Sequence, residues 1–502
     1  MDFFAPLCYN RQKFYRRYFV LNKRVFSELQ PERVFYYFEE ICGIPHGSRN
    51  TRQISDYLVR FAQEHGLRWV QDVANNVVIY SDGTPGYEHH PTVILQGHMD
   101  MVAEKTKDSP IDFTKDGLDL RTDGEYVWAE GTTLGGDDGI AVAYALALLE
   151  SDKLPHPPLE CVFTVDEEIG MLGAAVLDTS VLKGKILINC DSEDEGILTV
   201  SCAGGATSCL ELPIYSDKAE GKGIHIYVDG LIGGHSGQEI NRGRANSNRV
   251  MGQLLEKLLR QMPFRLVYVR GGMKDNAIPR YTMAKVIVAE HRLDDAMKAI
   301  DEIGAALLKT LPEQETGANI YAEPCICRGH AMTIASTRDT IGMLNEVPNG
   351  VQAMSKDIEG LVQTSLNLGI LKTEGGIVSM TFSVRSSVNE EKIALIEQLR
   401  KVGEKYGADY TESGAYPAWE YRRESHLRDV MIQVFEENYG RKPVVEAIHA
   451  GLECGLFSDR IPGLDCVSFG PDMQDIHTTR EKLSVASTSR TWEYLTEILA
   501  RL

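Results

Sequence analysis

The order in which helix-like and strand-like segments follow one another limits the folds open to this chain. From residue 31 to about 205, amphipathic segments such as "TRQISDYLVRFAQEHG" alternate with short apolar runs, among them "TVILQ", "LECVFTV" and "KILIN". These runs are apolar on both faces, which is typical of strands in a sheet covered by helices. Strands that alternate with helices predict an α/β layer fold.

A different pattern occupies the middle of the chain. Near Ser201 it changes to alternating strands such as "IHIYVDG" and "MAKVIVAE", separated by amphipathic helices, and the α/β pattern returns with "LRDVMIQVFEENYG" and "LDCVSFG". We therefore expect one discontinuous α/β domain, with a mixed sheet and helices, interrupted by an inserted α+β domain. The expected boundaries are an N-terminal extension at 1–28, the first part of the α/β domain at 29–205, the insertion at 206–415 and the second part at 416–502.

Length and composition exclude several classes of protein. A chain of 502 residues is too long for one core, and 43% hydrophobic with 25% charged residues is ordinary for a globular soluble protein. The net charge of −20 argues against a nucleic-acid-binding protein, which would carry a basic face. Because no run of eighteen apolar residues occurs, no membrane span is expected.

Cysteine usage and the N-terminus favour a cytoplasmic location. Ten cysteines occur without a CxxC pair, and several lie in apolar strands, where a reduced thiol packs as a small hydrophobe. The start, "MDFFAPLCYNRQKFYRRYFVLNKRVF", lacks the apolar core of a signal peptide. We interpret residues 1–28 as an extension that is open to disorder, and an over-long start is favoured over a functional arm.

Acidic and histidine side chains follow four of the predicted strands. In open α/β sheets, functional residues gather beyond the carboxyl ends of the strands. An acidic pair also follows the turn "GTTLGG" and opens a buried helix. These residues are His98 and Asp100, then Asp166, Glu167 and Glu168, then Asp191, Glu193 and Asp194, then Asp472, Asp475 and His477, with Asp137 and Asp138 as the pair.

Taken together, these residues predict a metal cluster. So many carboxylates in one cleft would repel one another unless cations neutralised them. Imidazole and carboxylate suit Zn²⁺, with Mn²⁺ or Co²⁺ as alternatives, and two metals about 3.5–4 Å apart can share one bridging aspartate. Each motif alone has a simpler explanation, since "DEE" is often a solvated loop and "DD" a helix cap. Their joint occurrence favours the metal cluster.

The motifs also resemble a known family. "LQGHMDMV", "GTTLGGDDGI", "FTVDEEIGMLGA", "NCDSED", "GGHSGQEINRGRAN", "DNAIPR", "VPNGV", "TSLNLG", "IHAGLECG" and "DIHTTREKLSV" are similar to the aminoacyl-histidine (Xaa-His) dipeptidases, or peptidase D. These belong to the di-zinc metallopeptidase clan that includes carboxypeptidase G and carnosinase. The resemblance covers about residues 30 to 502 in order. It implies a zinc-peptidase catalytic domain with an inserted lid, and a homodimer.

The resemblance implies a role for each matching residue. Two Zn²⁺ per subunit would be held by His98, Asp137, Asp191, Glu168 and His477, with Asp137 as the bridge. Glu167 would be the general base, and Asp100 would orient the imidazole of His98. His235, in the lid, would stabilise the oxyanion. Weaker candidates for substrate contact are Arg385, His449, Gly451 and Glu453, and Arg385 could equally be a strand-face charge.

These features predict a metal-dependent dipeptidase that cleaves dipeptides, including carnosine-like Xaa-His substrates. A metal lowers the pKa of bound water from about 15.7 toward 7, and Glu167 has the chemistry to take the proton. A deacylase or exo-carboxypeptidase with the same metal core is the first alternative. A non-catalytic metal-binding protein is the second, and the presence of Glu167 argues against it, because a binder needs no base. No nucleic-acid or membrane partner is expected.

Overall fold

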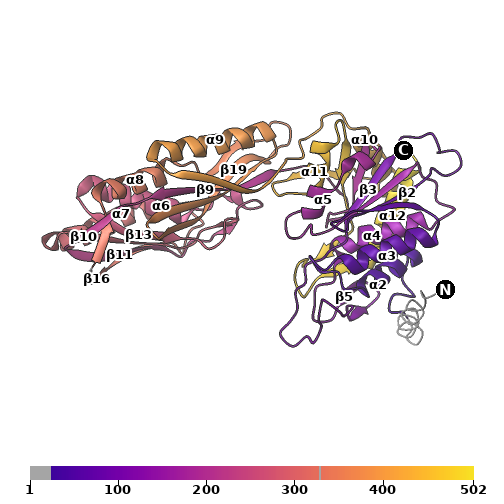
Figure 1. The fold of residues 1–502 in the computed structure, drawn as a ribbon, viewed down its shortest axis with the longest axis horizontal. Coiled ribbons are helices and arrows are strands. Elements are labelled where there is room, and N and C mark those ends of the chain that lie inside the picture. Colours follow the sequence, from indigo (N-terminus) through magenta and orange to yellow (C-terminus); the bar gives the residue numbers. More distant parts are fainter. Residues whose placement is uncertain (1–23, 327–328) are drawn as a thin grey trace, which may run out of the picture. The chain divides into compact units, whose positions relative to one another are not determined.

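The chain forms two compact units, which are described separately. The computed structural model describes residues 24–326 and 329–502, so residues 1–23 of the expected extension lie outside the described part. The first unit comprises the described residues up to Leu198 together with Glu424–Val445 and Ile461–Leu502. The second comprises Thr199–Arg423 and Glu446–Arg460 (Figure 1).

An eight-stranded mixed sheet organises the first unit. Its central strands β6, β3, β7 and β23 are parallel neighbours, whereas β1, β2 and β6 pair antiparallel. The chain crosses between the two units four times, and two of these crossings lie within β8 and β22. In sheet order the strands are β1 (Arg68–Gln71), β2 (Val77–Ser81), β6 (Leu159–Thr164), β3 (Val93–His98), β7 (Ile186–Asn189), β23 (Asp465–Ser468), β8 (Ile197–Cys202) and β22 (Val444–Ile448).

Helices bury the central strands. Every residue of β3, β6 and β7 is buried, and α4, itself buried along its whole length, packs against α2 and β3. This explains why these segments are apolar on both faces. The helices of the unit are α2 (Glu32–Cys42), α3 (Arg52–Glu64), α4 (Gly136–Leu149), α5 (Leu172–Val176), η1 (Thr179–Val181), α10 (His426–Tyr439) and α12 (Val485–Leu499). A smaller sheet contains β24 (Met473–Gln474), β25 (Lys482–Ser484), β5 (Tyr126–Ala129) and β4 (Leu120–Thr122).

Four segments differ from the expected domain boundaries, since residues 199–205 and 416–423, expected in the α/β domain, also belong to the second unit. Residues 24–28, expected within the extension, pack on α2, where the ring of Phe26 stacks on Phe38 at 6.3 Å. Residues 446–460, expected in the α/β domain, belong to the second unit. The reason is long-range pairing, because Ala203 N–H donates to the carbonyl of Ile448 (3.1 Å).

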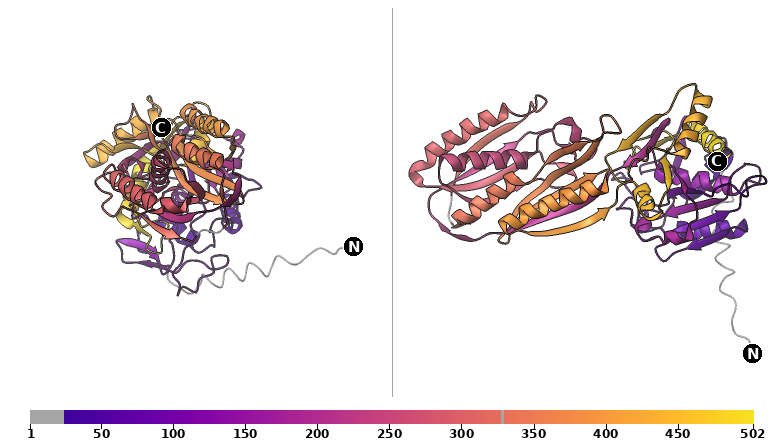
Figure 2. Two further views of the ribbon diagram at one scale, coloured as in Figure 1. Left: turned by 90° about the vertical axis from the view of Figure 1, so that its left-hand side faces the viewer. Right: turned by 90° about the horizontal axis from the view of Figure 1, so that it is seen from above.

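A nine-stranded sheet with helices on one face forms the second unit. The paired strands described in it run antiparallel, and α6, α7, α8 and α9 cover one face (Figures 1 and 2). In order the strands are β16 (Asn319–Cys325), β11 (Lys222–Asp229), β15 (Thr282–Val288), β13 (Arg265–Gly271), β19 (Val362–Glu374), β20 (Ile377–Ser386), β9 (Gly204–Pro213) and β21 (Asp409–Tyr416), with β18 (Gly350–Met354) paired to β19.

Shorter elements complete the second unit. Its helices are α6 (Ser247–Gln261), α7 (Leu293–Leu308), α8 (Ile334–Glu346), α9 (Asn389–Tyr406), α11 (Glu453–Arg460), η2 (Ile240–Arg242) and η3 (Glu290–Arg292). Its two-stranded pairs are β10 (Ser216–Ala219) with β17 (Gly329–Met332), and β12 (Gly234–His235) with β14 (Ala277–Ile278). The large buried cluster between the helices and one face of the sheet accounts for the alternating pattern of the strands.

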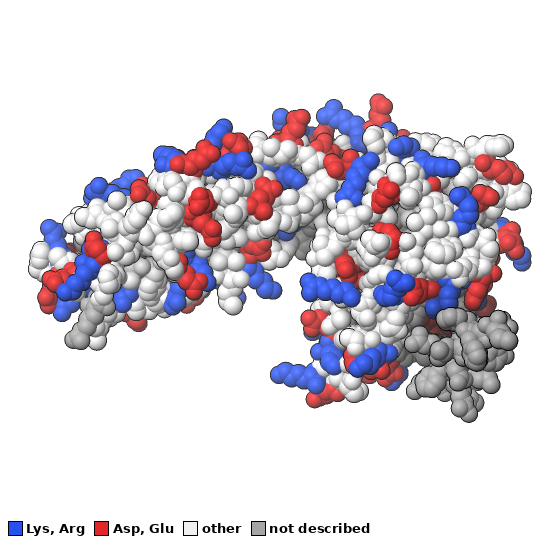
Figure 3. Space-filling view, in the orientation of Figure 1, with Lys and Arg blue, Asp and Glu red and all other residues white. Residues whose placement is uncertain are grey.

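The surface mixes charges of both signs. On the face drawn in Figure 3, Lys and Arg side chains are interspersed with Asp and Glu over both units. Among the described residues, no helix combines the length and apolar character needed to cross a membrane.

Candidate metal centre

The first unit brings six of the predicted site residues to one edge of its sheet. His98 is the last residue of β3, Glu167 and Glu168 follow β6, and Asp191 follows β7. Because β6, β3 and β7 are parallel neighbours, their carboxyl ends meet at one edge. Asp137, in the first turn of α4, and His477, between β24 and β25, complete the group.

Asp137 lies between the two histidines. Its Oδ1 is 3.0 Å from Nε2 of His98, and its Oδ2 is 3.1 Å from Nε2 of His477. Glu168 Oε2 is 3.0 Å from the same His477 nitrogen, and Asp191 Oδ1 is 3.9 Å from His98 Nε2. One carboxylate therefore offers a separate oxygen to each imidazole, which is the arrangement that a bridging ligand requires.

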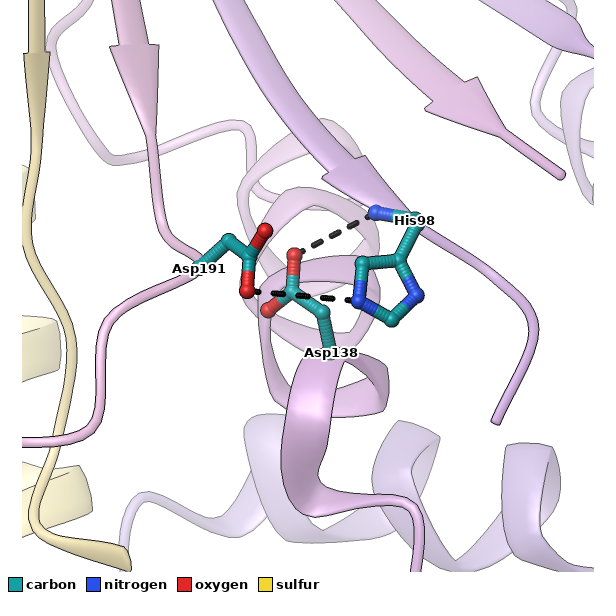
Figure 4. Close-up of side chains that lie close together, drawn as sticks. All are labelled: His98, Asp138 and Asp191. Carbon is teal, nitrogen blue, oxygen red and sulfur yellow. Dashed lines mark hydrogen bonds and ion pairs between the residues drawn. The ribbon is translucent and has the colours of Figure 1, made fainter. Parts of the chain in front are cut away.

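The neighbouring Asp138 contacts the main chain instead. The peptide bond that joins it to Asp137 is cis, and its Oδ2 accepts the N–H of His98 at 3.2 Å. Figure 4 shows the carboxylates of Asp138 and Asp191 beside the His98 ring. Donor atoms of His98, Asp138 and Asp191 lie within 4.8 Å of one another, as do those of His98, Asp137 and Glu168.

The electrostatics of the cluster fit a bound cation. Burial, and then the negative charge of Asp137, raise the pKa of the Asp191 carboxyl well above its usual range. Oε1 of Glu168 is buried and has no hydrogen-bond partner among the described residues. A cation would supply the missing partner and relieve the repulsion. A set of imidazole and carboxylate donors without thiolate suits first-row divalent metals.

Asp100 contacts both His98 and the Glu167 main chain. The orienting contact differs from the expected one, because Nδ1 of His98 donates to the carbonyl oxygen of Asp100 (2.9 Å), whereas the carboxylate Oδ1 lies 3.6 Å away. That Oδ1 accepts the N–H of Glu167 (3.0 Å), and Oδ2 accepts the hydroxyl of Ser48 (2.8 Å). The carbonyl group of Asp100 thus keeps a proton on Nδ1 of His98 and leaves Nε2 available to a metal. The Asp100 carboxylate instead holds the main chain of Glu167. Sequence reasoning missed Ser48, whose loop "HGSRN" has no metal-binding signature.

In the second unit, His235 is held with one nitrogen free to donate. Its Nδ1 accepts the N–H groups of Gly237 (3.3 Å) and Gln238 (3.1 Å). Burial, and then the positive charge of Arg385, lower the pKa of His235 below its usual value. The neutral ring therefore carries its proton on Nε2, which can donate to an oxygen.

Two of the weaker substrate-contact candidates, Arg385 and His449, lie near this histidine. A Cβ on Gly237 would lie 2.6 Å from the carbonyl oxygen of His449, so the His235 loop packs against residue 449. Burial and the charge of Arg385 lower the pKa of His449 to about 3, and its Nε2 lies 2.7 Å from the Ser365 hydroxyl.

The other candidates differ in accessibility. Arg385, on β20, donates to the Tyr416 hydroxyl (3.2 Å), and its Nε is buried without a partner among the described residues. Gly451 is half-buried in the loop before α11, whereas Glu453, the first residue of α11, is fully buried. Arg385 thus retains donor capacity, and Glu453 offers a ligand little surface.

Metal binding is expected to release protons. Hydrogen bonds to Asp137 and Glu168 raise the pKa of His477 to about 10. Burial by itself would lower the pKa of His98, but its contacts with Asp100 and Asp137 outweigh burial and raise this pKa above its usual value. His477 is therefore protonated in the metal-free protein at neutral pH, and it must lose this proton before it can bind a metal. Zinc affinity should fall as pH falls.

Calorimetric titration of zinc into chelated protein at pH 7, in two buffers of different ionisation enthalpy, measures this release. Heats that are the same in both buffers would contradict it. In the metal-free protein, the free energy of unfolding should also depend on pH. The stabilisation by the His477 ion pairs is fully present below the unfolded pKa near 6.5 and is lost as pH rises through about 10.

Comparison with known proteins agrees with this geometry. The sequence model of peptidase family M20/M25/M40 matches residues 94–501. The chain is 36% identical over 479 residues to the cytosol non-specific dipeptidase of Escherichia coli (strain K12), covering 95% of this chain and 99% of the relative.

Solved structures show the same relationship. The crystal structure of aminoacylhistidine dipeptidase from Vibrio alginolyticus superposes with a TM-score of 0.90 at 37% identity, covering 95% of this chain and 98% of that one. The aminopeptidase PepT of Bacillus cereus shares the fold at 16% identity, with a TM-score of 0.54 and coverage of 94% and 98%. From the match of the family model over most of its length and from these relatives, the chain belongs to peptidase family M20/M25/M40.

Proposed function

We propose that this protein is a metal-dependent dipeptidase that hydrolyses the peptide bond of dipeptides, including Xaa-His substrates of the carnosine type. The observation that supports it most is the Asp137 carboxylate between His98 and His477, beside the anchored Glu167. Substrate class is supported by similarity over almost the whole chain to a non-specific dipeptidase and an aminoacylhistidine dipeptidase.

Two metal ions are assigned to the cluster. His98, Asp137 and Asp191 would hold one, and Asp137, Glu168 and His477 the other. We propose Zn²⁺ for both, with Co²⁺ or Mn²⁺ able to substitute, because imidazole and carboxylate ligands suit these ions. When bound, the pair lowers the pKa of a water molecule and polarises the substrate carbonyl.

The side chains then move the proton and stabilise charge. The Glu167 carboxylate takes a proton from the attacking water and delivers it to the leaving amine. Asp100 keeps Glu167 in place through its main-chain N–H. From the resemblance to the dipeptidase family, Nε2–H of His235 is proposed to donate to the carbonyl oxygen as that oxygen becomes negative. Arg385 and His449 are proposed to contact the substrate.

Location and assembly are also proposals. A cytoplasmic location is supported by the cytosolic designation of the Escherichia coli relative. The eight cysteines among the described residues are all buried or half-buried, in agreement with thiols packed as small hydrophobes. The homodimer is proposed from the resemblance to the dipeptidase family.

A substrate panel tests the proposal. The purified, zinc-loaded protein is given β-alanyl-histidine, Gly-His, Ala-His, Leu-His, one tripeptide and one N-acetyl amino acid, and product release is followed by chromatography. Cleavage of the dipeptides, with the tripeptide and the acetylated compound spared, is the expected result. Cleavage of the acetylated compound alone would instead identify a deacylase. No cleavage with both metals bound would indicate a metal-binding protein without this activity.

A further inference from the structure

A buried carboxylate outside the ligand set holds the turn that leads into Asp137. Glu481 is only 3% exposed. Its Oε2 accepts the N–H groups of Leu134 (2.8 Å) and Gly135 (3.2 Å), and its Oε1 accepts that of Gly136 (2.8 Å). Three consecutive main-chain donors therefore converge on one carboxyl group, which is the arrangement of a backbone nest.

The glycines of the turn make this approach feasible. Gly135 has a φ of 69°, a left-handed conformation that glycine adopts without steric cost. A Cβ on Gly136 would lie 3.3 Å from Oε1 of Glu481 and 3.1 Å from Sδ of Met473. A larger residue at position 136 would therefore crowd the Glu481 carboxyl group. The glycines of "GTTLGGDD" thus allow the main chain of this turn to approach the Glu481 side chain closely.

The same side chain joins two segments that carry proposed metal ligands. Gly136 immediately precedes Asp137, and Glu481 lies four residues after His477 in the loop between β24 and β25. The N–H of Glu481 also donates to the carbonyl of Thr478 (3.2 Å). A shift of the turn relative to this loop would separate Asp137 from His477, whose side chains lie 3.1 Å apart.

We propose that Glu481 is a positioning residue, which fixes the main chain before Asp137 so that its carboxylate faces His98 and His477 before any metal binds. The inference rests on the proposed role of Asp137 as a shared ligand. It deepens that role, because it identifies a residue that sets metal affinity without touching the metal. Groups that orient ligands in this way typically alter affinity by about 10–100-fold when they are replaced.

Glu481→Gln in the full chain tests the proposal, with Glu160→Gln as the matched control. Glutamine keeps one acceptor oxygen, so at least one of the three N–H groups loses its partner. Glu160 is also 3% exposed and accepts main-chain N–H groups from Lys183 (2.9 Å) and Gly184 (3.0 Å). It lies at the start of β6, whereas the metal cluster lies beyond the end of that strand. A purely structural role would give the two variants the same effects.

Two readouts need no substrate. The first is hydrogen exchange of the amides of Leu134, Gly135 and Gly136 in the metal-free protein, and the second is Co²⁺ affinity from visible absorption. We expect these amides to be protected in the unaltered protein and to exchange faster in Glu481→Gln. We expect Co²⁺ affinity to fall about 10–100-fold in that variant and to stay unchanged in Glu160→Gln. Glu481→Asp, which keeps the charge, should recover part of the affinity.

Several outcomes would overturn the proposal. Rapid exchange of the three amides in the unaltered, metal-free protein would show that the turn is not held, and this measurement requires no variant. Unchanged Co²⁺ affinity in Glu481→Gln, or equal losses in both glutamine variants, would also contradict it. None of these results depends on dipeptide hydrolysis, so a failure of the proposed activity is detected separately by the substrate panel.

Discussion

Replacement of Glu167 by Gln is expected to lower kcat for β-alanyl-histidine by about 10²–10⁴-fold while both metals stay bound. Glutamine has nearly the same shape but cannot accept a proton from water or pass it to the leaving amine. The contact that anchors this residue survives, because it is the main-chain N–H of residue 167 that donates to Asp100. The loss should therefore appear in kcat, with zinc content unchanged.

Steady-state kinetics together with metal analysis of the purified variant measure this effect. Asp194→Asn is the control, because it removes an exposed carboxylate from the segment after β7 and Asp194 has no proposed role in catalysis. It should keep the unaltered rate. Unchanged kcat in Glu167→Gln would show that another group is the base. Loss of zinc from that variant would show that Glu167 serves as a ligand instead.

Replacement of Asp137 by Asn is expected to have the second large effect, the loss of metal and of all detectable hydrolysis. The shared carboxylate offers one oxygen to each side of the cluster, so its removal weakens both proposed metal positions together. Zinc content should fall from about two ions per chain to less than one. Metal analysis after dialysis against a defined free zinc concentration measures this.

The adjacent aspartate supplies a matched comparison. Asp138→Asn keeps an oxygen that can accept the N–H of His98, so it should retain more zinc than Asp137→Asn. The reverse order, with metal lost from the residue 138 variant and kept by the residue 137 variant, would assign the bridge to Asp138. The donor atoms of Asp138 lie close enough to His98 and Asp191 for the comparison to be informative.

The strands that build the site were predictable because both of their faces are buried. The run "LECVFTV" predicts a strand at 159–165, and β6 spans Leu159–Thr164; "KILIN" predicts 185–189, and β7 spans Ile186–Asn189. Full burial leaves a continuous apolar run in the sequence. His98, expected just after a strand, is the last residue of β3, and such one-residue differences are normal at element ends.

Contacts through the main chain could not be predicted. The carbonyl of Asp100 that accepts from His98, and the three N–H groups that surround Glu481, belong to groups every residue carries. Their positions depend on turn geometry, which apolar periodicity does not report. Glu481 lies within the motif "DIHTTREKLSV", yet a single glutamate four residues after a histidine gives no indication of burial. The inclusion of residues 446–460 in the second unit likewise depends on long-range pairing.

Hydrolysis of β-alanyl-histidine by the chelated protein, followed as zinc is returned in known amounts, tests the central claim most directly. We expect no turnover without metal and recovery that is complete at about two zinc ions per chain. Full activity in protein whose metal content has been shown to be zero would contradict it. So would zinc uptake to two ions per chain without any release of histidine.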